Sequence, residues 1–122
     1  MLKVVFCTDG QPVNDFSACN FVDGVINGYC RGYGEPMEIR FSTEAVLDAF
    51  VLRVMEDKIP MNRIEFYYHG PEMVSDVKME FHEIRGLEIP EGVRDIGVRC
   101  HMTGEILRLG YEKLKAKRTA EK

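Results

Sequence analysis

The sequence lacks the features that mark membrane-spanning and secreted proteins. It has no run of about eighteen apolar residues, so it predicts no membrane-spanning helix. The apolar run at residues 4–6 is too short for a signal peptide, and Asp9 follows it closely. We therefore expect a cytoplasmic protein with no membrane contact, in which thiols stay reduced. The four cysteines are Cys7, Cys19, Cys30 and Cys100.

Motifs for binding nucleotides or zinc are missing as well. The tripeptides Gly-Lys-Ser and Gly-Lys-Thr do not occur, and the Gly-x-Gly at residues 32–34 does not follow a predicted strand. No two cysteines form a Cys-x-x-Cys pair. Cys100 and His101 could join Cys19 and Cys30 on zinc, but a helix would hold the last two about 16 Å apart. We therefore interpret the cysteines as core thiols.

Charge is divided unevenly along the chain. There are 16 Lys and Arg residues against 20 Asp and Glu residues, which gives a net charge of −4 at pH 7. Residues 113–122 contain five basic residues and one acidic residue, so the first 112 residues carry −8. An acidic body repels phosphate backbones, so we expect no nucleic-acid partner. The basic end either contacts an anionic partner or is the solvated C-terminal end of a helix.

Apolar patterning predicts one domain over residues 1–122. The predicted strands are 2–7, 37–41, 63–69 and 77–82, and the predicted helices are 15–31, 44–58 and 104–118. Two strand–helix–strand units predict parallel pairing with right-handed crossovers, and the last two strands predict an antiparallel hairpin. We therefore predict a small mixed α/β fold of about four strands and three helices, with α+β as the alternative.

Three further expectations concern burial and loops. The unbroken apolar run at residues 4–6 predicts a strand that is covered on both faces. Residues 86–99 are expected to be mostly loop, and Thr103 is the expected N-cap of the last helix. The side chains expected to face the core from that helix are Ile106, Leu107, Tyr111 and Leu114.

The helix predicted at residues 44–58 is apolar most of the way round. Leu52 interrupts its polar side, where the spacing of Glu44 and Asp48 predicts another charge. Such a helix must be covered on more than one side, either by a second layer of this chain or by another protein. Self-association through this helix or through the edge of the hairpin would also fit. The expected contact residues are Leu47, Val51, Leu52 and Met55.

Polar side chains follow the predicted parallel strands. Parallel pairing would bring Asp9, Glu44 and His69 to one edge of the sheet, where α/β proteins form sites. These three groups could bind a divalent metal or act in general acid–base catalysis. Each also has a structural interpretation: Asp9 starts a turn, Glu44 complements a helix dipole after an N-cap at Ser42 or Thr43, and His69 ends a strand.

A thiol nucleophile is a further alternative. Cys7 lies at the end of a central predicted strand, and His69 ends another strand. A Cys–His pair requires hydrogen-bond contact between the two side chains, so its existence depends on the fold.

Two short stretches carry a resemblance to a known family. Residues 41–44 read Phe-Ser-Thr-Glu before a predicted helix, and residues 86–95 contain a Gly, a Pro, a second Gly and an Asp in the order Gly-x-x-x-Pro-x-Gly-x-x-Asp. Over residues 37–110 the chain thereby resembles the C-terminal segment of soluble ATP-binding-cassette-type ATPases encoded in bacterial anti-phage defence loci. Ser42 stands where that family has a switch histidine, and the family's ATP-binding motifs have no counterpart. The resemblance implies a small defence-associated relative that pairs with an ATPase, and it implies no ATP hydrolysis.

These observations leave two classes of function. The leading hypothesis is a non-enzymatic, cytoplasmic accessory protein that needs no cofactor and acts through contacts with a protein partner or a second copy. The alternative is a small metal-dependent hydrolase or a small-ligand-binding protein that uses Asp9, Glu44 and His69, with a divalent metal as cofactor.

Overall fold

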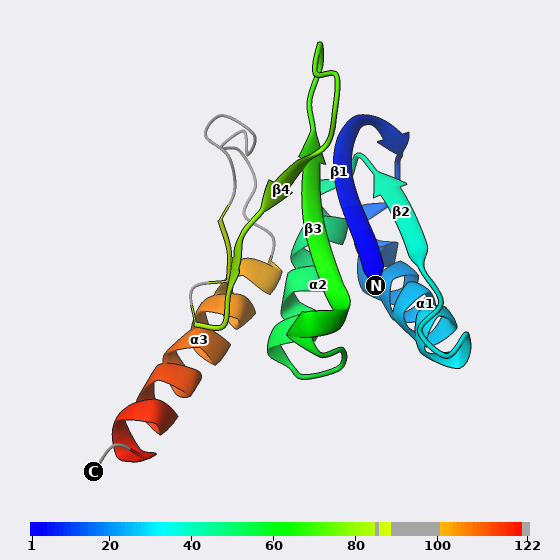
Figure 1. Cartoon of the computed structure of the whole chain (residues 1–122). Helices are drawn as coiled ribbons and strands as arrows, with labels where there is room; N and C mark the ends of the chain where they lie inside the picture. The colour runs from blue at the N-terminus through cyan, green and yellow to red at the C-terminus, as the bar shows by residue number, and fades with distance from the viewer. Residues whose placement is uncertain (85, 89–100, 121–122) are drawn as a thin grey trace.

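A computed structural model of the chain describes residues 1–84, 86–88 and 101–120 (Figure 1). It shows a four-stranded mixed sheet in the order β2-β1-β3-β4, a two-stranded sheet of β5 and β6, and three α-helices. The predicted small α/β fold is thereby confirmed. The strands are β1 (Leu2–Gln11), β2 (Met37–Phe41), β3 (Ile64–His69), β4 (Val77–Met79), β5 (Phe81–His82) and β6 (Gly86–Leu87). The helices are α1 (Ala18–Arg31), α2 (Glu44–Met55) and α3 (His101–Ala120), with short 3-10 turns η1 (Asp15–Ser17) and η2 (Met61–Arg63).

β1 is the central strand of the main sheet. It pairs in parallel with β2 and β3, and β4 joins the free side of β3 in the antiparallel direction. The parallel units and the antiparallel hairpin are therefore confirmed. The strand expected at residues 77–82 is divided at Glu80 into β4 and β5. Part of the expected loop, Gly86–Leu87, is strand β6, and residues 89–99 lie outside the described residues.

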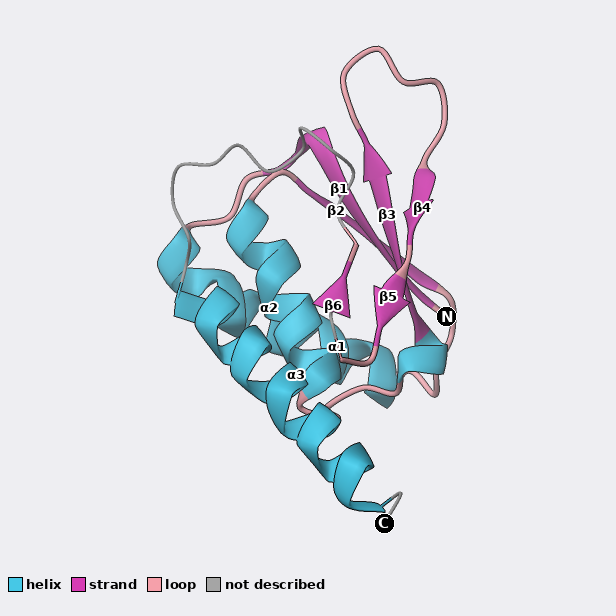
Figure 2. Ribbon diagram, turned by 90° about the vertical axis from the view of Figure 1, so that its left-hand side faces the viewer, coloured by secondary structure: helices cyan, strands magenta, loops and turns pink. Residues whose placement is uncertain are grey.

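The helices lie on one side of the main sheet (Figure 2). The core cluster contains Leu2 and Val4 of β1 together with residues of α1 and α2, and it excludes Val5 and Cys7. The steps from β1 to β2 and from β2 to β3 run in opposite directions across the sheet. Helices on one face therefore give the two crossovers opposite hands, and the expectation that both are right-handed is wrong for one of them.

A bend in β1 accounts for the entry of the chain into α1. β1 continues past Phe6 and curls over the end of β2, so that Phe41 pairs with both Phe6 and Gln11. At this crossing, a Cβ on Gly10 would lie 2.6 Å from the backbone carbonyl carbon of Phe41. Only glycine permits that approach. The Ser42 N–H then donates to the Gln11 carbonyl at 3.1 Å, which fixes the curl to the start of the next connection.

α2 is covered within the chain by the sheet, α1 and α3. Its apolar circumference is thereby explained by a second layer of this chain. The four residues expected as a partner contact are 0% (Leu47), 2% (Val51), 6% (Leu52) and 2% (Met55) exposed, so they offer no surface on the folded chain. Arg53 joins this packing by an ion pair with Asp23 of α1, with 2.7 Å between Nε and Oδ1.

α3 packs on α2 with a different face from the one expected. The helix begins at His101, so Thr103 lies inside it and is not its N-cap. Leu107 and Tyr111 are 64% and 66% exposed, which makes the expected inner positions of these two wrong. The close approach occurs at Gly110, where a Cβ would collide with the backbone carbonyl of Ile84. The missing side chain at Gly110 permits this approach and thereby sets the rotation of the helix. The inward side chains are Ile106, Leu109, Lys113 and Leu114.

Candidate functional site

The structure does not gather the three residues expected at the strand ends into one group of ligands. Asp9 lies on the exposed curl of β1, Glu44 is the first residue of α2, and His69 is the last residue of β3. Within residues 1–84, 86–88 and 101–120, no three His, Cys, Asp or Glu side chains gather as ligands for a metal ion. Thr43 occupies the N-cap position of α2, but its hydroxyl bonds the backbone N–H and carbonyl of Val13 at 2.8 and 2.9 Å.

The imidazole of His69 instead belongs to an ion network on the face of the sheet that the helices leave open. Its Nδ1 lies 2.9 Å from Oδ1 of Asp76. The Asp76 carboxylate also accepts hydrogen bonds from Lys3 Nζ at 2.8 Å and from Arg40 Nη2 at 2.9 Å. One carboxylate therefore joins β1, β2 and β3. Hydrogen bonds from Arg40, then Lys3, hold the pKa of Asp76 well below its usual range.

This network buries part of β1 without a covering helix. Val5 and Cys7 are 0% and 1% exposed although their side chains lie on the open face. Lys3 crosses above the ring of Tyr67 at 4.7 Å from its centroid while its ammonium reaches Asp76. The strand is therefore covered on both faces, as expected from its apolar run, and long charged side chains supply the cover on one of them.

Cys7 lies beside His69 in the parallel register, as a nucleophile pair would require. However, the ring nitrogen Nδ1 of His69 is directed to Asp76. Burial raises the pKa of the Cys7 thiol, and the nearby Arg40 only partly opposes that effect. A reactive cysteine needs a lowered pKa and access to solvent, and Cys7 has neither. The geometry therefore describes a buried thiol on the open face of the sheet.

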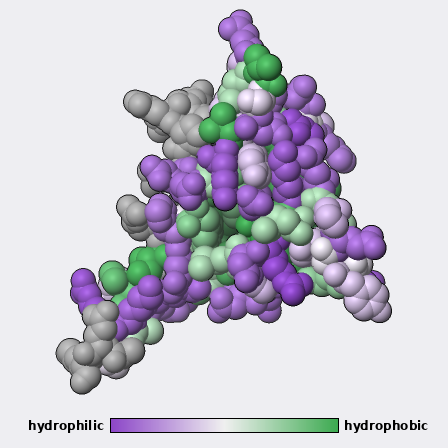
Figure 3. All heavy atoms as spheres, viewed as in Figure 1, coloured by the Kyte–Doolittle hydropathy of each residue, from purple (hydrophilic) through white to green (hydrophobic). Residues whose placement is uncertain are grey.

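The outward face of α3 carries exposed apolar side chains next to basic ones. Leu107 and Tyr111 lie one helical turn apart, and Lys115 and Arg118 continue the same face. We call these four residues the outer stripe of α3. In Figure 1 the C-terminal half of α3 extends away from the sheet. Figure 3 shows apolar surface among polar atoms along this part of the helix.

Charges beside the outer stripe are paired within α3 itself. Arg108 contacts Glu105 at 2.7 Å and Glu112 at 2.8 Å. Lys115 and Arg118, by contrast, have no charged partner among the residues that the structure describes. The stripe therefore combines two apolar side chains with two cations that are available to a partner. The sequence contains this pattern, but assigning Leu107 and Tyr111 to the core concealed it.

The chain was also compared with known proteins. Its described helices include none that is long and apolar enough to cross a membrane. No protein-family model matches the chain, and no match was found among curated proteins or among solved structures.

Proposed function

We propose that this protein is a non-enzymatic, cytoplasmic accessory protein that binds another protein through the outer stripe of α3. The observation that carries the proposal is the exposure of Leu107 and Tyr111, 64% and 66%, on a helix whose opposite face is already packed on α2. Two adjacent apolar groups on one helical face can be covered together by a helix of a partner. Covering them would remove apolar surface from water, which favours association.

The cations of the stripe indicate the chemistry of that partner. Lys115 and Arg118 favour a helix with apolar residues in its centre and carboxylates beside them. Two stripes facing each other would add only positive charge, so the pattern favours a different protein over a second copy. The three described cysteines form no disulfide, which agrees with a reducing compartment. The resemblance over residues 37–110 would make an ATPase of the defence class a partner of this kind, and it stays a prediction.

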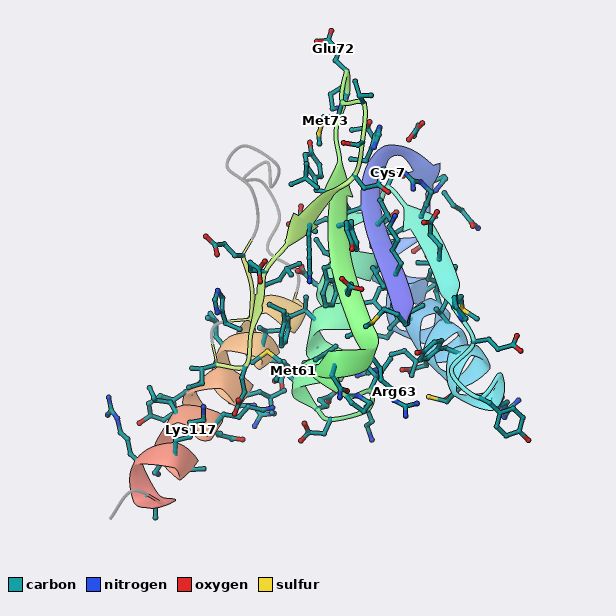
Figure 4. The ribbon with its side chains drawn as sticks, in the orientation of Figure 1. Cys7, Met61, Arg63, Glu72, Met73 and Lys117 are labelled. Carbon is teal, nitrogen blue, oxygen red and sulfur yellow. The ribbon has the colours of Figure 1, made fainter. Side chains whose placement is uncertain are left out.

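Photo-cross-linking in cells tests this proposal. A benzophenone amino acid replaces Leu107 in the full chain. A matched control carries it at Val74, which is 98% exposed and follows Met73 on the connection between β3 and β4, away from α3 in Figure 4. We expect one protein to be cross-linked from position 107 through an acidic, amphipathic helical peptide, and none from position 74. The combined changes Lys115→Glu and Arg118→Glu should abolish this product.

Two outcomes would contradict the proposal. Equal labelling of many proteins from positions 107 and 74 would show that Leu107 is only a solvated side chain. A product that contains only a second copy of this chain would replace the accessory role with self-association. Mapping the cross-linked peptide by mass spectrometry distinguishes these outcomes and identifies the class of the partner.

A further inference from the structure

β4 pairs with only part of β3. β3 pairs with β1 along its whole length, but it pairs with β4 only from Phe66 to Tyr68. At Glu80 the chain leaves β3 and enters β5, which pairs with β6 in a separate sheet. Among the described residues, no strand lies beside Ile64 and Glu65 on this side. The start of β3 therefore has an unpaired edge.

A cleft of about 350 Å³ lies where β4 has left β3. Met1 and Met61 line it and are 44% and 46% exposed, and Met79 lies deeper at 3%. The rings of Phe66 and Phe81 stack beside it with centroids 5.8 Å apart. Figure 3 shows apolar surface at the middle of this face, and Figure 4 shows Met61 next to the start of β3. The lining therefore includes an apolar part that is rich in adaptable methionine side chains.

A second unpaired strand edge borders the same cleft. β5 uses one edge to pair with β6, and Phe81 of β5 lines the cleft. β5 lies between β6 and the main sheet in Figure 2, so its other edge faces β3. Unpaired edges expose N–H and carbonyl groups that readily bond an added strand. An extended segment in this position would extend the main sheet toward β5.

Charged groups of both signs stand at the rim of the cleft. Glu65 holds Lys78 by an ion pair with 3.2 Å between Oε2 and Nζ, and it accepts a hydrogen bond from the Tyr67 hydroxyl at 3.1 Å. These contacts lower the pKa of Glu65, with Lys78 as the larger cause. Glu80 also lines the cleft and is exposed. Lys78 and the N-terminal ammonium of Met1 both act on Glu65, whereas Glu80 has no ion-pair partner among the described residues, which favours a basic residue of the ligand beside Glu80.

We infer that this cleft binds an extended segment of another protein as an added strand between β3 and β5. The ligand places alternate apolar side chains against the methionines and a basic side chain beside Glu80. The cleft shares no residue with the outer stripe of α3. The two surfaces can therefore be tested separately.

Titration of the full, 15N-labelled chain with short synthetic peptides tests this inference. The probe is a capped six-residue peptide that alternates valine and lysine. We expect it to shift the amide resonances of Ile64, Glu65 and Phe81, to slow hydrogen exchange at the first two, and to bind with a Kd of about 1 mM or tighter. A peptide that alternates valine and glutamate should bind at least about fivefold more weakly. A version with proline in the centre should lose binding, because it cannot donate to the strand edge.

A pair of matched charge reversals gives the control. Glu80→Lys should weaken binding of the valine–lysine peptide about fivefold. Glu72→Lys makes the same change at an exposed residue on the distant tip that Figure 4 shows, and it should leave binding unchanged. Leu107→Glu should also leave binding of the peptide unchanged. The peptide experiment therefore tests the cleft independently of the role proposed for the outer stripe of α3.

The inference would be overturned if millimolar peptide moved none of these amides, if the proline peptide bound equally well, or if Glu72→Lys acted like Glu80→Lys. Dimerisation of the peptide-free chain that protects the same amides would also overturn it, because the occupant would then be a second copy.

Discussion

The two faces of the main sheet bury the same strand by different means. On one face, Val4 is 0% exposed because apolar side chains of the helices cover it. On the other face, Val5 is also 0% exposed, although no described helix lies over it and its surroundings include Lys3, Arg40 and Asp76. A side chain of this sheet can therefore be completely buried without a layer of apolar side chains above it. The helix-covered face depends on close packing, whereas the open face depends on a few charge-assisted hydrogen bonds.

The largest expected loss of stability comes from disrupting the packing on the helix-covered face. Leu52→Glu places a carboxylate at a position that is 6% exposed on α2, and we expect a loss of more than about 4 kcal/mol in the free energy of unfolding. Leu107→Glu is the matched change at a position that is 64% exposed, and it should cost less than about 0.5 kcal/mol. Urea unfolding followed by circular dichroism measures both. A folded Leu52→Glu chain with normal stability would show that α2 is not packed as described.

A smaller loss of stability is expected from disrupting the ion network on the open face. Asp76→Asn removes the carboxylate shared by Lys3, Arg40 and His69, and the amide cannot replace all three bonds. We expect a loss of about 1–2 kcal/mol in the free energy of unfolding, because the network is partly solvated. Glu72→Gln, at an exposed carboxylate, is the control and should change little. An Asp76→Asn chain as stable as the original would show that other contacts bury Val5.

Acidification should reduce the difference in the free energy of unfolding between the original chain and the Asp76→Asn chain. The pKa of Asp76 is lower in the folded chain than in the unfolded chain. Its stabilising contribution is therefore complete above the ordinary aspartate pKa of about 4 and is lost progressively as the pH falls below that value. Urea unfolding at several pH values should show a constant difference between the two chains above about pH 5 and a smaller one near pH 3. A difference that is independent of pH would contradict the ionic role of Asp76.

The smallest effect concerns thiol reactivity on the open face. Cys7 is 1% exposed with a raised pKa, whereas Cys30 is exposed. Cys7 should therefore react with a thiol reagent at pH 8 at least about tenfold more slowly than Cys30. If the network excludes solvent from Cys7, Asp76→Asn should bring the reaction rate of Cys7 closer to that of Cys30. Peptide mapping after timed alkylation measures both rates, and equal rates in the original chain would show that the network leaves Cys7 accessible.

Several sequence predictions succeeded because they depend on local patterns. The apolar spacing of α1 and α2 and the alternation of apolar and polar residues before Glu80 indicated the right types of element. The all-round apolar pattern of α2 also predicted its coverage on several sides, and the chain itself supplies that cover.

The site predictions depended on distances between elements, and there the sequence was insufficient. It placed His69 at a strand end, but no local pattern indicates that Asp76, seven residues later, bends back to its ring. Leu107 and Tyr111 were assigned to the core because their spacing fits an inner face equally well. The approach of Gly110 to Ile84 decided the rotation of α3, and that contact is not local.

The sequence by itself determined the succession along the chain of the main strands and helices, the parallel units and the burial of α2, because hydrophobic periodicity acts over neighbouring residues. Only the tertiary structure decided which face of the sheet stays open, which side of α3 meets solvent, and where β4 leaves β3 to open a cleft. These features arise from contacts between residues far apart in the chain, such as Asp76 with Lys3 and Ile84 with Gly110. Such contacts depend on how whole elements pack, and each element's own pattern is compatible with more than one packing.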